Sequence, residues 1–380
     1  MDASDLNNEL SRCLGCRAKP CEKACPLGVS PHDFIAAAKQ GDFLMAASLI
    51  SKKNPMPKTC GLVCPNRFCQ KACIRAKIDT AIEIPCLQAK IMSLGGYSEL
   101  IFPKQNHKKV AVIGGGPAGL GALYELLMAG FIVDLYEKAD ILGGAARLIP
   151  PYRLPKSVLD DEINRLIKND RTKVYLNTEI TDFHLLKSQY DGVILALGKT
   201  TPYTLGIKGE EYCTSYHNYL SNIKNGSSQK IAVTGGGEAA LDCAVSAKKN
   251  GSDCVEMFVR RRREDMRIMD RNQQELNRLN IKIHDLTSIT EIKKTNKGYD
   301  LDIIKNRIND QGKAEHIIGT ESTLSGYDMV IQALGSYYPK ELMPEGFIMA
   351  GDMTGSTGTI VEALASGRDA AKELIRKEQS

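Results

Sequence analysis

The chain has 380 residues, 43 % of them hydrophobic, which is enough for two or three packed domains. Its net charge of +5 is too small to indicate nucleic-acid binding, and no run approaches the ~20 apolar residues of a membrane-spanning helix. The N-terminal residues lack the basic-then-apolar pattern of a secretory signal. We therefore expect a cytoplasmic protein that binds neither nucleic acid nor a membrane.

Residues 1–102 favour helices and carry nine of the chain's 12 cysteines. A helical stretch is expected over residues 31–54, with Ser30 as its N-cap, Pro31 in its first turn and Gly41 interrupting it. The polar residues 102–109 are typical of a linker. The sequence therefore predicts a small all-helical domain that ends near residue 102.

Eight of these cysteines form two runs, residues 13–25 and 60–73. Clustered cysteines in a reducing compartment bind metal more often than they form disulfides. Zinc sites favour paired CxxC motifs, often with histidine, but these runs hold one CxxC and have only His32 nearby. Proline after cysteine, at Cys25 and Cys64, resembles the ferredoxin pattern. The runs predict two [4Fe–4S] clusters, with zinc or inert thiols as alternatives.

Spacing alone leaves the assignment of the cluster ligands open. Each run holds one cluster, or the runs exchange ligands in a crossed arrangement, as in two-cluster ferredoxins. Cys86 is a ninth candidate ligand.

From residue 110 the pattern changes to strand, glycine loop, helix and strand. In this G-x-G-x-x-G loop, Gly114 permits a tight turn, Gly116 lets the backbone approach a pyrophosphate, and Gly119 lets the helix pack on the strand. Pro117 and Ala118 open the helix, whose N-terminal amides suit phosphates. The loop predicts a dinucleotide site, and a tight structural turn is the alternative.

Glu137 ends the second strand of this unit, eighteen residues after Gly119. A carboxylate there can accept hydrogen bonds from an adenosine ribose. Further strands are expected at residues 173–177 and 191–198.

The same pattern returns at residue 230. Its loop has Gly235 and Gly237, with Ala240 at the third position, and Glu238 and Ala239 open the helix. Further strands are expected at residues 282–289, 299–306 and 327–335.

An arginine run follows the second strand of this later unit. Arg260 stands where the ribose acid would be expected, followed by Arg261, and Arg267 lies seven residues further on. A guanidinium pairs well with a ribose 2′-phosphate, so the site favours NADPH over NADH. The alternative, a solvated arginine face, is expected to hold for two of the four arginines in the run.

Near the C-terminus, Gly351 and Asp352 follow a short strand, and Asp352 can bind a hydroxyl of a bound flavin. Thr359, Ile360 and Val361 open a helix whose N-terminal amides suit the electron-rich pyrimidine edge of a reduced flavin. A capped helix after a turn is the alternative.

An order of use follows from these features. The first glycine loop is expected to hold FAD and the second NADPH. NADPH gives two electrons at once and each cluster accepts one, so the flavin belongs between them.

The chain as a whole resembles the family of the small subunit of bacterial glutamate synthase and the N-terminal half of dihydropyrimidine dehydrogenase. It looks closest to the separate electron-input subunits of the bacterial NAD(P)-dependent dihydropyrimidine dehydrogenases. The resemblance rests on the cysteine runs, both glycine loops and the segments "IPPYRLPK", "DGVILALG" and "AGDMTGSTGTIVEALASGR".

The resemblance implies an α/β protein in which a helical double-cluster domain precedes two Rossmann-like units of the glutathione-reductase type, the second inserted in the first. The expected iron–sulfur domain covers residues 1–102. The FAD domain covers 103–202 and 336–380, and the NAD(P)H domain covers 203–335.

The resemblance also implies crossed ligation. One cluster would be held by Cys13, Cys16, Cys21 and Cys73, and the other by Cys25, Cys64, Cys69 and Gln88. Cys60 would then be a bystander, and the neighbouring Cys86 competes with Gln88 for the fourth place. Gly144, Arg153 and Gly198 join the candidate flavin contacts.

The family also implies the function. We expect an electron-input subunit that oxidises NADPH through FAD and two clusters and serves a catalytic partner of the glutamate synthase or dihydropyrimidine dehydrogenase type, in a hetero-oligomer. A free-standing oxidoreductase that reduces a ferredoxin-like or small acceptor is the runner-up, and a non-enzymatic scaffold is a third reading. No CxxC follows either glycine loop, so disulfide reductase chemistry is not expected, and Cys213, Cys243 and Cys254 are expected to be structural.

Overall fold

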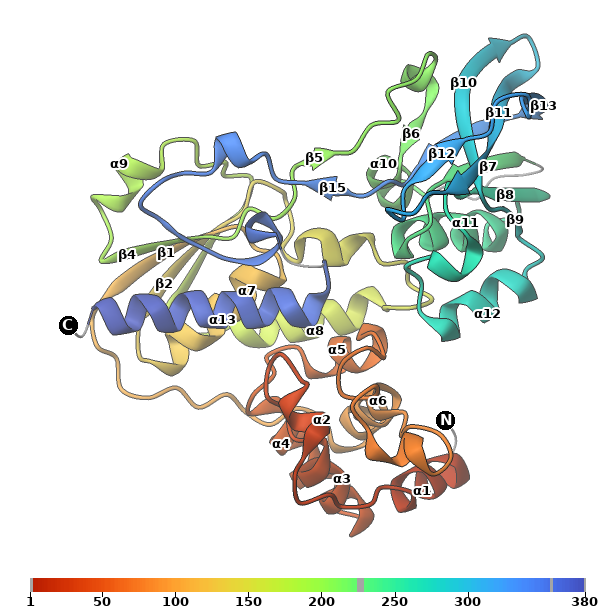
Figure 1. Ribbon diagram of the computed structural model, residues 1–380. Coiled ribbons are helices and arrows are strands. Elements are labelled where there is room, and N and C mark those ends of the chain that lie inside the picture. Colours follow the sequence, from red (N-terminus) through yellow and green to blue (C-terminus); the bar gives the residue numbers. More distant parts are fainter. Residues whose placement is uncertain (1–2, 224–228, 356–357, 379–380) are drawn as a thin grey trace. The chain divides into compact units, whose positions relative to one another are not determined.

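The computed structural model describes residues 3–223, 229–355 and 358–378 (Figure 1). The chain divides into two compact units. The first comprises Met1–Arg147, Pro151–Thr200 and Tyr338–Ser380, and the second comprises Leu148–Pro150 and Thr201–Tyr337. The second unit is therefore an insertion in the sequence of the first.

The N-terminal part of the first unit is helical, with no strand in its described residues 3–102. Its helices are α1 (Ala3–Ser11), α2 (Pro20–Lys23), α3 (Pro31–Lys39), α4 (Phe43–Ser51), α5 (Pro57–Val63) and α6 (Ile84–Gly95). The break between α3 and α4 falls at Gly41, which adopts a positive φ of 80°. The predicted helices and their interruption are confirmed.

The rest of the first unit is built on a parallel sheet with the strand order β16-β4-β1-β2-β3. The strands are β1 (Lys109–Ile113), β2 (Ile132–Tyr136), β3 (Thr172–Tyr175), β4 (Gly192–Leu195) and β16 (Ile348–Met349). The helices are α7 (Pro117–Met128), α8 (Lys156–Ile167), α9 (Phe183–Lys187) and α13 (Ile360–Lys377). The strand order reverses between β1 and β4, so the sheet has a switch point there.

Two glycines let α13 lie directly against α7 (Figure 1). A Cβ atom on Gly367 would lie 1.8 Å from the carbonyl oxygen of Ala118, and one on Gly121 would lie 2.3 Å from that of Leu364. This close packing returns the C-terminal segment to the helix that follows the first glycine loop.

The helical part is joined to the sheet part through buried polar contacts. Glu162 on α8 is fully buried, and its two carboxylate oxygens accept the backbone N–H groups of Lys58 (2.6 Å) and Thr59 (3.0 Å) at the start of α5. The Tyr97 hydroxyl donates to the same carboxylate at 3.1 Å. At the surface, Arg67 also pairs with Glu362 on α13 at 2.8 Å.

The second unit holds another parallel sheet, in the order β6-β14-β7-β8-β9. The strands are β6 (Thr214–Ser215), β7 (Lys230–Thr234), β8 (Cys254–Phe258), β9 (Lys282–His284) and β14 (Met329–Gln332). Helices α10 (Tyr216–Ser221), α11 (Glu238–Lys249) and α12 (Asp270–Arg278) belong to the same unit. A short antiparallel pair, β5 (Thr201–Pro202) with β15 (Ser336–Tyr337), lies at its chain ends.

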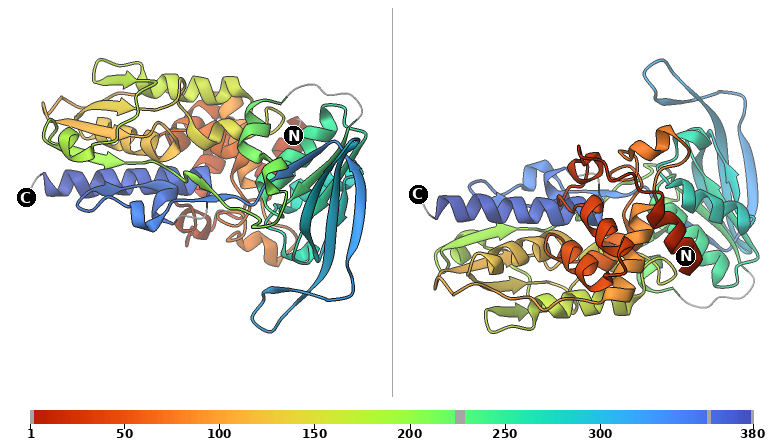
Figure 2. Two further views of the ribbon diagram at one scale, coloured as in Figure 1. Left: turned by 90° about the horizontal axis from the view of Figure 1, so that it is seen from above. Right: turned by 90° about the horizontal axis from the view of Figure 1, so that it is seen from below.

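An antiparallel sheet completes the second unit, and its long hairpin is seen in Figure 2. Its strands are β10 (Thr287–Thr295), β11 (Gly298–Ile308), β12 (Ala314–His316) and β13 (Ser322–Tyr327). The single strand predicted for residues 282–289 is wrong, because Leu286 adopts a positive φ of 44° and separates β9 from β10. Strands β12 and β13 were not predicted.

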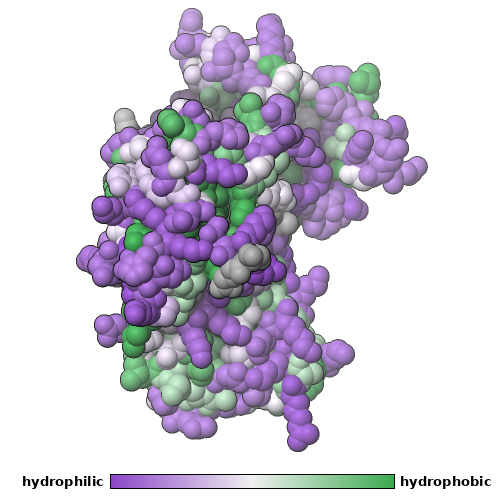
Figure 3. Space-filling model, turned by 90° about the vertical axis from the view of Figure 1, so that its left-hand side faces the viewer, coloured by the Kyte–Doolittle hydropathy of each residue, from purple (hydrophilic) through white to green (hydrophobic). Residues whose placement is uncertain are grey.

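The described residues contain no helix long and apolar enough to cross a membrane. The face drawn in Figure 3 is mostly hydrophilic, with hydrophobic residues scattered over it.

Candidate cofactor sites

The first glycine loop is folded so tightly that side chains are excluded. Gly114 has a φ of 108°, and a Cβ atom there would lie 2.3 Å from the carbonyl oxygen of Ala196. A Cβ atom on Gly119 would lie 1.8 Å from the carbonyl oxygen of Gly114. Both glycines are therefore required by the backbone itself, as the motif predicts.

Two backbone segments form a bare cradle beside this loop. Gly116 is the N-cap of α7, and a Cβ atom on Gly144 would lie 2.9 Å from the Gly116 Cα atom. Gly143 donates its N–H to Gly115 at 2.8 Å. Amides at the start of the 12-residue helix α7, next to Gly116 and Gly144, which carry no side chain, fit a pyrophosphate.

Glu137 follows β2 directly and is bound to the loop. Its Oε2 atom accepts the N–H of Gly115 at 2.8 Å and its Oε1 atom accepts that of Ala139 at 2.9 Å. Each carboxylate oxygen has a second lone pair, so Glu137 can accept ribose hydroxyls while it holds the loop.

The C-terminal segment reaches the same edge of the sheet. Gly351 has a φ of 77°, and a Cβ atom there would lie 2.6 Å from the Cβ atom of Ala118, the second residue of α7. Asp352 is the next residue. The structure thus brings the predicted C-terminal residues to the first glycine loop, although more than 200 residues separate them along the chain.

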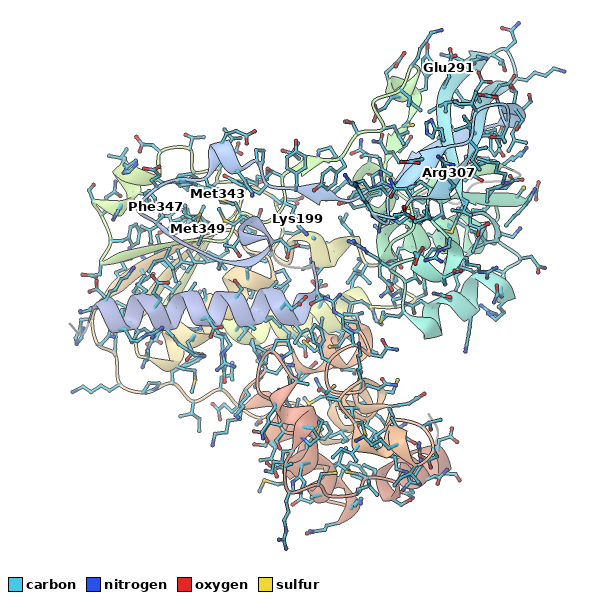
Figure 4. All side chains as sticks on the ribbon, viewed as in Figure 1. Lys199, Glu291, Arg307, Met343, Phe347 and Met349 are labelled. Atoms are coloured by element: carbon cyan, nitrogen blue, oxygen red, sulfur yellow. The ribbon has the colours of Figure 1, made fainter. Side chains whose placement is uncertain are left out.

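Lys199 is a residue at this site that sequence reasoning missed. It follows β4 and Gly198, and its Nζ atom lies 3.6 Å from Oδ2 of Asp352 (Figure 4). Both residues follow strands at the carboxyl edge next to the switch point, where ligands of open α/β sheets bind. The available signal was a cation directly after an A-L-G segment that ends a strand.

Helix α13 starts where the sequence predicts, and Thr359 caps it. The Thr359 hydroxyl accepts the N–H of Glu362 at 3.3 Å and donates to its carboxylate at 2.6 Å. Ile360 and Val361 form the first turn of this 18-residue helix. Arg153 is half-buried in the segment before α8.

The second glycine loop repeats the geometry of the first. Gly235 has a φ of 139°, and a Cβ atom there would lie 2.3 Å from the carbonyl oxygen of Ala333. Gly237 is the N-cap of α11, with open space where its side chain would be. Ala240, at the third motif position, is fully buried and has a Cβ atom where the first loop has none.

Glu238 and Ala239 form the first turn of α11, and Glu238 organises the segment that faces the loop. Its carboxylate accepts the N–H of Met269 at 2.7 Å and the side-chain amide of Asn272 at 2.8 Å. Arg267 donates its backbone N–H to Gly236 at 2.8 Å. Arg267 therefore lies beside the second glycine loop, as the sequence suggested.

The position expected for Arg260 was wrong by one residue. Tyr136 pairs with the last residue of β1, and Phe258 pairs with the last residue of β7, so Val259 occupies the place that Glu137 has in the first unit. Arg260 is the next residue. The strand ends one residue earlier than the arginine pattern suggested, and an apolar side chain takes the place of the ribose acid.

Two of the four arginines in the run have protein partners. Arg262 pairs with Asp265 at 2.8 Å, and Arg263 donates to Asn277. The exposed Arg260 makes no side-chain hydrogen bond or ion pair with the described residues, and Arg261 is half-buried beside Asp265. Arg260, Arg261 and Arg267 therefore stay candidate phosphate ligands.

All twelve cysteines are free thiols, and those of the two runs group across the runs. Burial raises the pKa of Cys21, and the nearby thiols of Cys13 and Cys73 act in the same direction. Cys16 lies with Cys13 in the loop between α1 and α2.

The second group is formed in the same way. Burial raises the pKa of Cys69, and the nearby thiols of Cys64 and Cys25, with a smaller effect from Cys21 of the first group, act in the same direction. This neighbourhood supports the crossed arrangement that the resemblance implies. No group of three His, Cys, Asp or Glu residues in 3–223, 229–355 and 358–378 is arranged for a single metal ion.

Donor groups around the second group fit an iron–sulfur cluster. Burial raises the pKa of Cys25, while the backbone N–H groups of Val29, Leu27 and Gly28 hydrogen-bond to it and act in the opposite direction. Such N–H···S bonds stabilise charge on cluster sulfurs. Gln88 is buried and donates its side-chain amide to the carbonyl of Pro57 at 2.7 Å, which leaves its oxygen as a possible ligand.

Cys60 and Cys86 differ from these thiols. Cys60 is buried, burial raises its pKa, and its Sγ atom donates to Asn54 at 3.7 Å. It therefore has a protein partner of its own, as expected of a bystander. Cys86 is half-buried on α6, two residues before Gln88.

Two known protein families match successive parts of the chain. Residues 1–95 match the family described as dihydropyrimidine dehydrogenase domain II, 4Fe-4S cluster. Residues 108–347 match the family described as pyridine nucleotide-disulphide oxidoreductase. The predicted fold class is confirmed, and so are iron–sulfur clusters and a flavin used with NAD(P)H.

Curated relatives carry related names. The NAD-dependent dihydropyrimidine dehydrogenase subunit PreT of Salmonella typhimurium is 32 % identical over 266 residues, which are 66 % of this chain and 64 % of that protein. The NADPH-Fe(3+) oxidoreductase subunit beta of Geobacter sulfurreducens is 30 % identical over 65 % of this chain and 39 % of that protein. The match thus spans less than two thirds of the length of these relatives.

Solved structures support the fold. FprA of Mycobacterium tuberculosis aligns with a TM-score of 0.63 over 72 % of this chain and 85 % of that chain, at 18 % identity. Thioredoxin reductase of T. acidophilum aligns with a TM-score of 0.52 over 72 % of this chain and 100 % of that chain, at 19 % identity.

Proposed function

The chain belongs to the pyridine nucleotide-disulphide oxidoreductase family, and on this premise we propose that it is an electron-input subunit. It oxidises NADPH and delivers single electrons through two [4Fe–4S] clusters to a catalytic partner. We assign residues 1–102 to the clusters, 103–202 and 336–380 to FAD, and 203–335 to NADPH. A bound flavin supplies the conversion from a hydride to single electrons.

The contact between Arg67 and Glu362 carries this proposal. Arg67 lies between Cys64 and Cys69, and Glu362 is bonded to the Thr359 cap of α13. The loop of the second cysteine group is therefore fixed to the helix start assigned to the flavin. Electron transfer needs such closeness, and an iron–sulfur segment with a purely structural role does not.

The residues of the second unit are proposed to choose the nucleotide. Gly235 and Gly237 present the amides of α11 to the pyrophosphate, and Val259 offers no carboxylate to a ribose hydroxyl. Arg260 and Arg267 are left to receive a 2′-phosphate, which favours NADPH. No side chain of this chain needs to transfer a proton in a hydride transfer, so their role is to position the nucleotide.

The partner is proposed to be a flavoprotein of the dihydropyrimidine dehydrogenase or glutamate synthase type, in a hetero-oligomer. Relatives named as subunits support a partner in general terms. A second candidate function is direct reduction of a ferredoxin-like or small acceptor, which the name of the Geobacter relative favours.

Anaerobic purification from the native cell, with the co-purifying chains identified by mass, separates these two functions. A stoichiometric flavoprotein that handles glutamine or a pyrimidine supports the subunit proposal. Purification without any stoichiometric partner, together with turnover of a ferredoxin or small acceptor from the same cell by the chain alone, contradicts it and supports the second candidate.

Iron analysis of single variants tests the cluster assignment. Cys73→Ser should remove about half of the roughly eight iron atoms expected for two [4Fe–4S] clusters. Cys60→Ser is the matched control from the same run and should retain them all. Full iron retention in Cys73→Ser, or loss in Cys60→Ser, would show that the crossed assignment is wrong.

A further inference from the structure

Three large apolar side chains lie exposed beside the first cysteine group. Leu14 is 45 % exposed, Ile74 is 37 % exposed and Ile78 is 65 % exposed. Leu14 lies between Cys13 and Cys16, and Ile74 follows Cys73 directly. Exposed apolar residues interleaved with redox ligands are unusual on a surface that only faces water.

The two segments that carry these side chains are fixed to each other. Arg12 donates to the carboxylate of Asp79 at 3.0 Å and to the Thr80 hydroxyl at 2.8 Å. Arg75 donates to the backbone carbonyl of Arg12 at 3.3 Å and also pairs with Asp79. The residues after Arg12 and those around Arg75 therefore form one surface.

The charge of this surface is positive. Arg17, Lys71 and Lys77 are exposed and make no ion pair with the residues that the structure describes. The nearby acids Glu9 and Asp79 are occupied by the guanidinium groups of Arg12 and Arg75. Glu22, which lines the same pocket as Arg17, lies within ion-pair distance of Lys19 and Lys53.

The two cysteine groups differ in their surroundings. In the second group Cys69 is buried while Cys25 and Cys64 are half-buried, and the loop that ends at Cys69 is tied to α13 by Arg67. The thiols of the first group are all half-buried and lie among exposed residues. An electron that enters at the second group would therefore leave by the first.

We propose that Leu14, Ile74, Ile78, Arg17, Lys71 and Lys77, called the exit patch, dock an acidic electron-acceptor protein. The inference rests on the proposed function and names the partner's chemistry: an apolar contact area ringed by carboxylates around a one-electron centre. Oxidation of one NADPH to NADP⁺ releases one proton and two electrons, which reduce two such acceptors by one electron each. Complementary charge at such a contact speeds association and makes it depend on salt.

A charge-reversal experiment tests the patch. The probe is an acidic plant-type [2Fe–2S] ferredoxin, reduced by the NADPH-loaded holoenzyme at several salt concentrations. The triple variant Arg17→Glu, Lys71→Glu and Lys77→Glu should lower the second-order rate constant at low salt by at least about tenfold, and added salt should then raise rather than lower the rate.

A matched variant and a second substitution control for general effects. Lys294→Glu, Lys297→Glu and Lys313→Glu reverse three exposed cations on the second unit and should leave the rate constant within about twofold of the wild type. Ile78→Asp, which touches no cysteine run, should lower the rate by itself. NADPH-driven bleaching of the flavin and the electron paramagnetic resonance signal of the reduced clusters should be unchanged in all variants.

The outcomes separate the two proposals. A triple variant and Ile78→Asp that both keep the wild-type rate and salt dependence overturn the exit patch. An equal loss in the Lys294, Lys297 and Lys313 variant also overturns it, because net charge alone would then explain the effect. A wild-type protein whose clusters NADPH does not reduce contradicts the proposed function instead.

Discussion

In each unit of the chain, the first strand of the βαβ motif is followed by a glycine with positive φ. This glycine lies against the backbone carbonyl of an alanine. Gly114 faces Ala196 in the first unit and Gly235 faces Ala333 in the second, each at 2.3 Å from an added Cβ atom. Two segments 121 residues apart thus use the same backbone to place amides at a helix start. The backbone specifies a pyrophosphate, and side chains around it must specify which dinucleotide.

Two differences lie within the βαβ motifs. The third motif position is Gly119 in the first unit and Ala240 in the second, so α7 approaches its loop more closely than α11 does. The residue after the second strand is Glu137 in the first unit and Val259 in the second. The first unit offers an acceptor to ribose hydroxyls, and the second leaves room for the cations that follow.

The third difference lies after the strand on the other side of the switch point. Gly198 and Gly335 both have positive φ, and the next residue is Lys199 in the first unit and Ser336 in the second. Only the first unit has a cation at this place, paired with Asp352 of the returning C-terminal segment. The two units therefore share the backbone of the glycine loop and differ in the side chains beside it.

Exchanging the third motif residues should have the largest effect. Gly119→Ala puts a methyl group 1.8 Å from a carbonyl oxygen, so α7 must move and flavin content should fall to near zero. Ala240→Gly removes a methyl group that has space, and should cost only about 1 kcal/mol of stability with NADPH binding retained. Flavin released per chain and the NADPH Kd are the measurements. Full flavin content in Gly119→Ala would show that the two loops are interchangeable.

Much of this comparison could be predicted from sequence because its determinants are local. The glycine loops, Glu137 and the cap at Thr359 depend on residues within one turn or one strand. The register of Val259 and Arg260 could not be read, because the end of β8 is set by its pairing with β7 and β9 and not by the arginine pattern. Lys199 was missed because its partner Asp352 is 153 positions away.

The contacts of the helical part were also beyond the sequence. Glu162 looks like an ordinary exposed helix residue in a polar stretch, but it is fully buried because the start of α5 docks on α8. The cysteine groups lie between these cases. Their spacing predicted clusters, but support for the crossed arrangement comes from the neighbourhoods of Cys21 with Cys73 and of Cys69 with Cys25.

Two buried glutamates sharpen the comparison through opposite pH effects. In the first unit, burial raises the pKa of Glu162 to about 7 despite bonds from Thr59 and Lys58. In the second, burial opposes ionisation of Glu256, but His284 and Tyr327 outweigh it and lower the pKa. Because the pKa of Glu162 is raised in the folded state, this residue lowers the free energy of unfolding as pH rises from about 4.5 to about 7, by at most roughly 3 kcal/mol. Because the pKa of Glu256 is lowered, the stability that this residue contributes is lost only as pH falls through its folded-state pKa.

Unfolding midpoints across pH, measured for each glutamine variant against the wild type, test this contrast. Relative to Glu162→Gln, the wild type should lose stability as pH rises through that window. Relative to Glu256→Gln, it should lose stability only at lower pH. Asp161→Asn, an exposed neighbour on α8, is the control and should show neither trend. Parallel curves for both glutamine variants would contradict the assignment.

The next largest effect is expected on the preference for NADPH over NADH. Arg260→Ala should weaken NADPH binding by about 10- to 100-fold, the value of a lost charge-assisted bond, and change NADH binding little. Val259→Glu gives the second unit the acid of the first and should shift preference further toward NADH. Arg262→Ala is the matched control, because its side chain already pairs with Asp265. Equal losses for both nucleotides in Arg260→Ala would show that this arginine does not bind the 2′-phosphate.

The smallest effect is expected from giving the first unit the serine of the second. Lys199→Ser removes the cation that lies 3.6 Å from Asp352 at the proposed flavin site, so two-electron reduction, which adds negative charge, becomes harder. We expect the midpoint potential of the bound flavin to fall by about 30–60 mV, where 30 mV corresponds to about 1.4 kcal/mol. Lys199→Arg should restore it, and Lys173→Ser, an exposed lysine on β3, should leave it unchanged. If Lys199 had only a structural role, its loss would change the flavin content and leave the midpoint potential where it was. An unchanged midpoint potential in Lys199→Ser with full flavin content would mean that the backbone shared by the two units, and not this side chain, sets the flavin's potential.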